Sequence, residues 1–100
     1  MATLYIAEYD RMLTDINGGR ILGFAEPPIA EQTVTISGTS ASSAAFNSQT
    51  RFIRVHTDVI CHVLCGKTPT AAATNQRFAA GQTEAKGVTA GDKIAVIEGT

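Results

Sequence analysis

The chain has 100 residues, a formal net charge of −1 and 17% charged residues, which leaves room for one domain with a single core. Its charges are dispersed and form no basic cluster, so the sequence lacks the electrostatic footprint of a nucleic-acid-binding protein. No apolar run approaches the roughly 20 residues that span a bilayer, and the first residues lack the pattern of a signal peptide, so we expect synthesis in a cytoplasm.

The N-terminal segment combines a β-favouring run with a short helical spacing. Residues 1–9 contain Leu4-Tyr5-Ile6 and predict either an edge strand or an extended N-terminal arm. The next segment, 10–17, spaces Met12, Leu13 and Ile16 as one or two helical turns would.

A turn-rich region and one clear strand follow. Asn17-Gly18-Gly19 predicts a turn, because both residue types accept positive φ. Residues 21–25 form a short apolar run before two prolines, and proline cannot donate to a sheet ladder, so we expect this run at a sheet edge or outside the sheet. In 31–36, aliphatic residues alternate with threonines, which predicts a half-buried antiparallel strand. Residues 37–43 then predict a polar loop, and 44–46 a further short strand.

The second half of the chain predicts four strands joined by turn residues. The strands are rich in β-branched residues and are expected at 51–56, 59–64, 76–80 and 93–97. Between them stand residue types that accept positive φ or fix a bend, namely Gly66-Lys67-Thr68-Pro69, Ala80-Gly81-Gln82 and Ala90-Gly91-Asp92.

Seven or eight short strands result, which is enough for two packed sheets. We therefore predict an all-β fold over residues 1–100: a single compact antiparallel β-sandwich or barrel, jelly-roll-like, with an extended N-terminal segment. In the strand at 51–56 we expect Ile53 and Val55 to face the core, and Arg54 and His56 to face solvent.

Cys61-His62-Val63-Leu64-Cys65 is the one grouping that suggests metal or redox chemistry. On a helix the two cysteines would share a face, as a soft metal requires. The flanking apolar residues predict a strand instead, in which the two sulfurs lie about 13 Å apart and His62 points to the other face. Neither a shared metal nor an intrachain disulfide fits that spacing. We interpret Cys61 and Cys65 as free thiols that pack as small hydrophobes.

The sequence also lacks a recognisable catalytic arrangement. A nucleophilic pair of Cys61 with His56 would need the two side chains to converge, and no glycine-rich nucleophile turn stands beside either cysteine. The nine carboxylates are scattered, with no close pair flanked by aromatic residues. We predict that the protein is not an enzyme and that it uses no metal or cofactor.

Small uncharged residues replace the missing charge, since the chain has 15 Ala and 13 Thr. A surface of this composition is easily desolvated, which suits a subunit whose faces are covered by neighbours. An ordinary Thr-rich β-domain would have a similar composition, so this feature alone does not separate the two interpretations.

Several stretches resemble small virion proteins encoded among the head genes of tailed bacteriophages: 46–58, 65–71, 79–84, 91–97, and the shorter 3–9 and 28–32. The resemblance covers most of the chain and leaves 10–26 and 37–45 unplaced. It lies in turns and strand ends, which identify a fold lineage better than a function. It implies a structural component of a phage particle, located in the virion and made in the bacterial host cytoplasm.

Within that group we expect a capsid decoration (cement) protein, bound to the outside of the phage head where major capsid subunits meet. Its expected partners are the major capsid protein and copies of itself, as a homo-oligomer such as a trimer. We expect Leu4, Tyr5, Ile6 and Tyr9 to form the interface, with the segment 4–9 acting as an added strand on a neighbour. On this view, deleting residues 2–9 abolishes shell binding and leaves the domain folded. The alternatives are a neck, tail or fibre-associated component, or a module that binds a host glycan.

Overall fold

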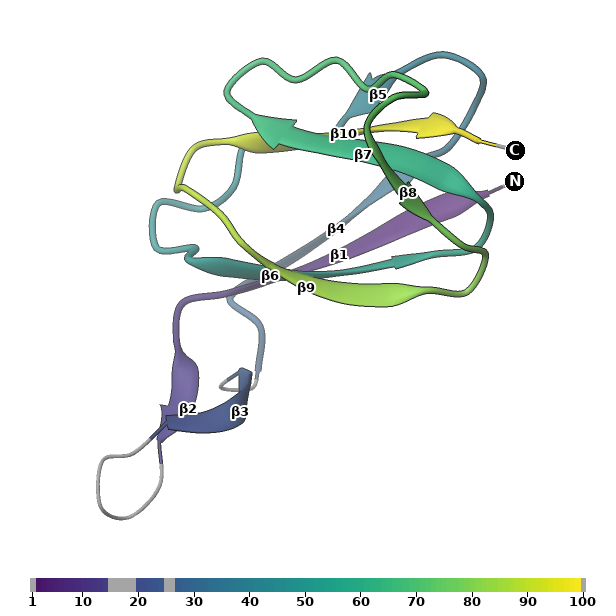
Figure 1. The fold of residues 1–100 in the computed structure, drawn as a ribbon. Helices are drawn as coiled ribbons and strands as arrows, with labels where there is room; N and C mark the ends of the chain where they lie inside the picture. The colour runs from purple at the N-terminus through teal and green to yellow at the C-terminus, as the bar shows by residue number, and fades with distance from the viewer. Residues whose placement is uncertain (1, 15–19, 25–26, 100) are drawn as a thin grey trace.

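Ten strands and no helix are present in the residues that the computed structural model describes, 2–14, 20–24 and 27–99. Eight strands form two four-stranded antiparallel sheets, and two form a separate small sheet (Figure 1). We call the sheet with the order β4-β1-β6-β9 sheet A, the small sheet of β2 and β3 sheet B, and the sheet with the order β5-β10-β7-β8 sheet C. The bounds are β1 Thr3–Tyr9, β2 Met12–Thr14, β3 Arg20–Phe24, β4 Ala30–Thr35, β5 Ala41–Ser42, β6 Phe52–Thr57, β7 Cys61–Gly66, β8 Gln76–Phe78, β9 Thr83–Gly87 and β10 Lys93–Glu98. The fold is an antiparallel β-sandwich, as the sequence predicts.

The strand order is that of a jelly roll that has been circularly permuted. When the eight sandwich strands are counted from β4 and β1 is counted last, sheet A reads 1-8-3-6 and sheet C reads 2-7-4-5, which is the jelly-roll order. In this chain the strand in the last place, β1, comes first. The start of β1 and the end of β10 therefore lie near each other (Figure 1), and the backbones of Ala2 and Glu98 both bond the segment after β4, at Ile36 and Ser37.

The core lies between the two sheets and follows the alternation of the strands. Leu4 and Ile6 of β1 point inward beside Ile53 and Val55 of β6, and sheet C faces them with aliphatic residues of β7 and β10. The buried cluster consists of Leu4, Ile6, Val34, Ile36, Phe46, Ile53, Val55, Cys61, Val63, Phe78, Ile94 and Val96. Arg54 is exposed and His56 is half-buried on the opposite face of β6, so the predicted orientation of this strand is confirmed.

The prediction that 1–9 forms an arm or an edge strand is wrong. β1 is an inner strand of sheet A and pairs with β4 on one side and with β6 on the other. Leu4 and Ile6 are 0% and 2% exposed, because the inward face of an inner strand is the centre of the core. The position of β1 therefore argues against the expectation that residues 2–9 can be deleted without unfolding the domain.

The segment after β1 also differs from its prediction. Met12–Thr14 forms strand β2 instead of a helical turn, and it pairs antiparallel with β3. Residues 15–17 of the expected helix and the turn at 17–19 lie outside the described residues. The run at 21–25 was expected at an edge or outside the sheet, and Arg20–Phe24 lies outside both sandwich sheets as strand β3.

Smaller differences concern short elements in the rest of the chain. The loop predicted at 37–43 contains the two-residue strand β5, whereas 44–46 forms no strand and attaches to the start of β10 by the bond from the Phe46 N–H to the Asp92 carbonyl. Strand β9 was not predicted. The turns at Gly81 and Gly91 are present, with φ of 77° and 84°, which is the backbone conformation that glycine adopts without strain.

A buried carboxylate fastens the loop before β6 to sheet A. Glu8 is 3% exposed, and its carboxylate accepts hydrogen bonds from the Thr50 hydroxyl (2.7 Å), the Asn47 N–H (2.8 Å) and the Gln32 amide (3.1 Å). Gln32 also accepts a bond from the Ala44 N–H at 2.9 Å. These bonds hold the loop that carries Phe46 into the core.

Candidate interaction face

The outer face of sheet C is partly covered by its own chain, although Leu64 of this face stays 39% exposed. Ala95 points away from the core and yet is 0% exposed, because the loop 67–75 lies over this face. The loop is held by bonds from the Ala71 N–H to the Ser40 hydroxyl (2.8 Å) and between His62 Nδ1 and the Asn75 carbonyl (3.1 Å). A partner that approached this side would meet the loop over much of the sheet.

The outer face of sheet A, by contrast, is open and is organised in rows across the strands. One row runs Thr33, Tyr5, His56, Thr83, and the next runs Glu31, Ala7, Arg54, Ala85, according to the strand register. The small side chain of Ala7 stands between an acidic and a basic residue, so it forms a low point between taller neighbours. A groove of about 390 Å³ lies there, lined by Tyr5, Ile6, Ala7, Glu31, Gln32, Thr33, Arg54 and His56.

Aromatic and polar contacts order the side chains around this groove. The rings of Tyr5 and His56 lie with centroids 6.2 Å apart at 43°, and His56 Nδ1 shares a hydrogen bond of 2.7 Å with the Thr83 hydroxyl. The guanidinium of Arg54 lies 5.4 Å from the centre of the Tyr9 ring, within the range of a cation–π interaction. The face therefore presents one exposed aromatic ring between groups of both charges.

The structure separates the four predicted interface residues. Only Tyr5 is available, with 47% of the residue exposed at the centre of the open face. Leu4 and Ile6 point into the core, and Tyr9 is 2% exposed beneath Arg54. The other groove residues, Ala7, Glu31 and Arg54, were not predicted as a site. Their alternation was visible in the sequence, but the pairing of β4, β1 and β6 that brings them together was not.

A projecting β-hairpin is the second feature that a partner could contact. β1 and β4 are neighbouring antiparallel strands, yet the chain between them forms the separate sheet of β2 and β3. This hairpin extends away from one end of the sandwich (Figure 1), and the molecule measures 47 × 25 × 23 Å along its principal axes. We call this hairpin, formed by β2 and β3, the arm. It is a different feature from the N-terminal arm that the sequence predicts for residues 1–9.

The cysteine and histidine residues that suggested chemistry are not brought together. Cys61 is buried, and its thiol lies 3.4 Å from the Thr57 hydroxyl, while His62 lies on the opposite face of β7. Burial raises the pKa of the Cys61 thiol, and it also raises the pKa of Cys65, so neither is primed as a thiolate. Both cysteines are free, and the described residues include no cluster of three or more side chains suited to hold a metal ion.

Comparison of the chain with protein-family models, with curated proteins and with solved structures found no match in any of the three. Within the described residues, no helix has the length and apolar character needed to cross a bilayer.

Proposed function

We propose that this protein is a structural component of a tailed-bacteriophage particle, a decoration (cement) protein that binds the outside of the head where major capsid subunits meet. Its partners on this proposal are the major capsid protein and copies of itself. Jelly-roll sandwiches occur in viral capsid and lectin domains. That association is one of fold alone, whereas function depends on particular surfaces of the molecule.

The observation that carries the proposal is the arm. Two adjacent antiparallel strands can be joined by two residues, whereas here residues 10–29 separate β1 from β4 and include a hairpin outside both sandwich sheets. A two-stranded hairpin alone is marginally stable in water. A projecting hairpin therefore gains most when it packs against another subunit, as a protein seated between capsid subunits would.

The open face of sheet A supplies a second contact surface. It is rich in small and polar side chains, and Tyr5 is the exposed aromatic residue at its centre. Tyrosine is enriched among residues that dominate interface energies. A protein that binds the assembled shell and not the free subunits stabilises the shell by its binding free energy, multiplied over many copies.

A neck, tail or fibre-associated component is the closest alternative. The arm and the open face would serve a ring around the particle axis as well as a site on the shell. The two functions differ in copy number, because a shell has many equivalent sites and an axial ring has few.

A module that binds a host glycan is favoured by one specific observation, the groove on sheet A. It combines the exposed ring of Tyr5 with the polar groups of Glu31, Arg54 and His56. Small-molecule sites combine apolar or aromatic side chains with a few hydrogen-bonding groups, and a sugar could be held by this combination. Titration of the protein with host surface polysaccharide, with Tyr5→Ala as control, separates this function from a shell contact.

The deciding experiment measures copies of this chain per purified particle by quantitative mass spectrometry, relative to the major capsid protein. We expect one copy per capsid subunit or per few subunits. A handful of copies per particle would favour the neck, tail or fibre. Absence from purified particles would refute the proposal.

A further inference from the structure

The free edge of β9 has the geometry of a strand-pairing site. β9 pairs with β6 on one side, and no described strand pairs with its other side. The Val88 N–H bonds the Arg51 carbonyl, and the Thr57 N–H bonds the Gln82 carbonyl, so the even-numbered residues of this segment direct their main-chain groups toward β6. Thr83, Ala85 and Gly87 therefore direct their N–H and C=O groups away from the sheet.

The side chains of these three residues leave that edge accessible. All three are exposed on the outer face of sheet A, and they are small and uncharged. A Cβ placed on Gly87 would meet no atom within 4 Å. An approaching strand would therefore meet main-chain groups without a bulky or charged side chain in front of them.

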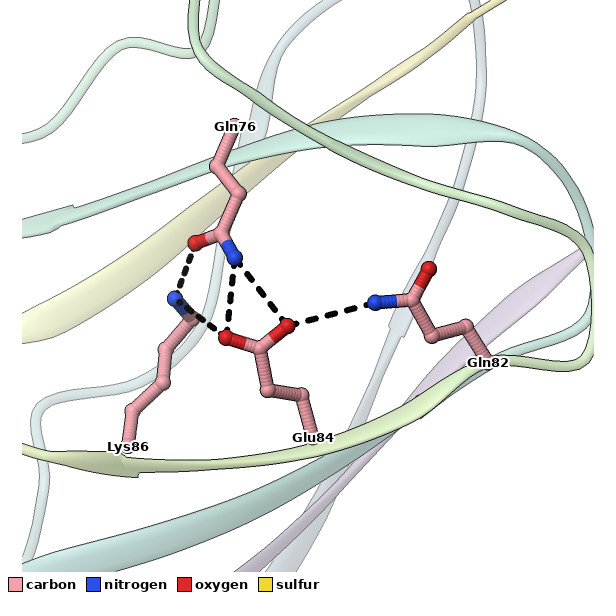
Figure 2. A network of polar contacts seen from close by, with 4 residues as sticks. All are labelled: Gln76, Gln82, Glu84 and Lys86. Atoms are coloured by element: carbon pink, nitrogen blue, oxygen red, sulfur yellow. Dashed lines mark hydrogen bonds and ion pairs between the residues drawn. The ribbon is translucent and has the colours of Figure 1, made fainter.

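The charged residues of β9 point the other way, into the open side of the sandwich. Figure 2 shows Glu84 and Lys86 within a network that also holds Gln76 of β8 and Gln82. The Glu84 carboxylate accepts bonds from the side-chain amides of Gln76 (2.8 Å) and Gln82 (3.2 Å). Lys86 Nζ lies 3.6 Å from this carboxylate and donates to the side-chain amide oxygen of Gln76. The two charges compensate each other next to the edge.

We propose that two copies of this chain pair through β9, antiparallel and two-fold symmetric about Ala85, to form one continuous eight-stranded sheet. In this register Ala85 lies opposite Ala85 of the second copy, and Thr83 lies opposite Gly87. These are hydrogen-bonded pairs, each exchanging two main-chain bonds, because they are the residues whose groups point outward. The interface is isologous, so it closes as a dimer and does not propagate.

Charge complementarity supports a second copy as the occupant. The two-fold register places Glu84 of each copy opposite Lys86 of the other, as a non-hydrogen-bonded pair whose side chains are close. An inward-facing lysine normally protects a sheet edge, because an added strand would bury its charge. Here Lys86 already lies 3.6 Å from Glu84 of its own chain, and a second copy of the same strand brings a second carboxylate, so this protection is weakened for that partner.

The other free edge of sheet A does not have this complementarity. A two-fold pairing of β4 about Thr33 would place Glu31 opposite Thr35 and Gln32 opposite Val34, with no ion pair in either position. Gln32 is also already bonded to Ala44. Two-fold antiparallel pairing is therefore favoured at β9 over β4, and β4 provides a matched control.

The test is the oligomeric state of the purified protein by sedimentation equilibrium. We expect a reversible dimer, and we expect Ala85→Pro to raise its dissociation constant about thirtyfold, because it removes the central N–H donors of both copies. Proline is tolerated on an edge strand where the N–H faces solvent. The control Thr33→Pro, at the equivalent place on β4, should leave the dimer unchanged.

Charge exchange then tests the register. Glu84→Lys should weaken the dimer by placing like charges opposite each other, and the double exchange Glu84→Lys with Lys86→Glu should restore it. A monomer at every concentration, or a dimer weakened by Thr33→Pro and not by Ala85→Pro, would overturn the proposal.

Hydrogen exchange on the wild-type chain tests the same contact without any substitution. The amides of Thr83, Ala85 and Gly87 should become protected as the protein concentration rises. Free exchange of all three in a sample that sediments as a dimer would contradict β9 pairing. The inference does not depend on the proposed function, because the dimer is measured on the isolated protein and the particle copy number is measured separately.

Discussion

At the residue scale, Glu8 shows how one polar side chain can hold a loop in a hydrophobic sandwich. Its buried carboxylate accepts three hydrogen bonds, two of them from Thr50 and Asn47 in the loop before β6.

We predict that Glu8→Ala lowers the free energy of unfolding by about 2–4 kcal/mol, because the buried donors lose their acceptor. Urea denaturation measures this loss. Glu31→Ala, at an exposed position of the same sheet, should change stability by less than about 0.5 kcal/mol. Equal stability of the two variants would show that Glu8 does not hold the loop.

Tyr5 and Leu64 form a matched pair for testing the open face. Both are large and exposed, at 47% and 39%, but Tyr5 lies on sheet A and Leu64 lies on sheet C. We predict that Tyr5→Ala weakens binding to particles that lack the protein by about tenfold or more, and that Leu64→Ala leaves it unchanged. Binding is measured by co-sedimentation with the particles, after thermal melts have shown that both variants fold. A larger loss with Leu64→Ala would move the contact to sheet C.

The same residues show how far local sequence predicts a site. Leu4-Tyr5-Ile6 was expected to act as one contact surface, but side chains alternate along a strand, so Tyr5 cannot face the same way as Leu4 and Ile6. That part of the answer was present in the sequence. The groove was not, because Glu31, Ala7 and Arg54 are far apart in the chain and meet only through the pairing of three strands.

At the element scale, the arm and the sandwich can be separated experimentally. Glu8 and Ala30 form the last pair of the β1–β4 ladder, and the Ile29 N–H bonds the Glu8 carbonyl at 2.8 Å. Replacement of residues 10–28 by Asn-Gly would close the Glu8–Ala30 pair with a four-residue loop, Tyr9-Asn-Gly-Ile29. We predict a variant that melts cooperatively and no longer binds particles, as measured by calorimetry and co-sedimentation. If the shortened variant bound as well as the wild type, the arm would have no part in attachment.

Elements were predictable where local and tertiary preferences agree. β6, β7 and β10 are rich in β-branched residues and were expected near their observed positions. β9 was missed because Thr-Glu-Ala-Lys-Gly has little intrinsic β preference, and its conformation comes from pairing with β6. β2 was predicted as helix because its apolar spacing fits a helical turn, whereas its partner strand β3 stabilises an extended backbone.

At the scale of the whole molecule, the permuted strand order could not be predicted from local patterns. Alternation and turn residues indicate that strands exist, but the order depends on which distant strands pair. The permutation has a structural consequence: it joins β1 to β4, the first and last strands of an ordinary jelly roll, and this new connection is the one that carries the arm. It also places the strand nearest the N-terminus inside sheet A.

That position makes the N-terminal strand indispensable, and the prediction that follows reverses the one drawn from the sequence. Deletion of residues 2–9 removes the ladders to β4 and β6 and takes Leu4 and Ile6 out of the core. Truncating two such side chains costs about 2–5 kcal/mol each, against a total stability of about 5–15 kcal/mol for a domain. We predict that the truncated chain is unfolded, with no dispersed amide signals in its NMR spectrum and no cooperative thermal transition. The Asn-Gly replacement of 10–28 is the control, because it removes more residues and keeps both ladders. A folded truncated chain would mean that β4 and β6 can close the sheet without β1, and that the N-terminal segment is dispensable for folding.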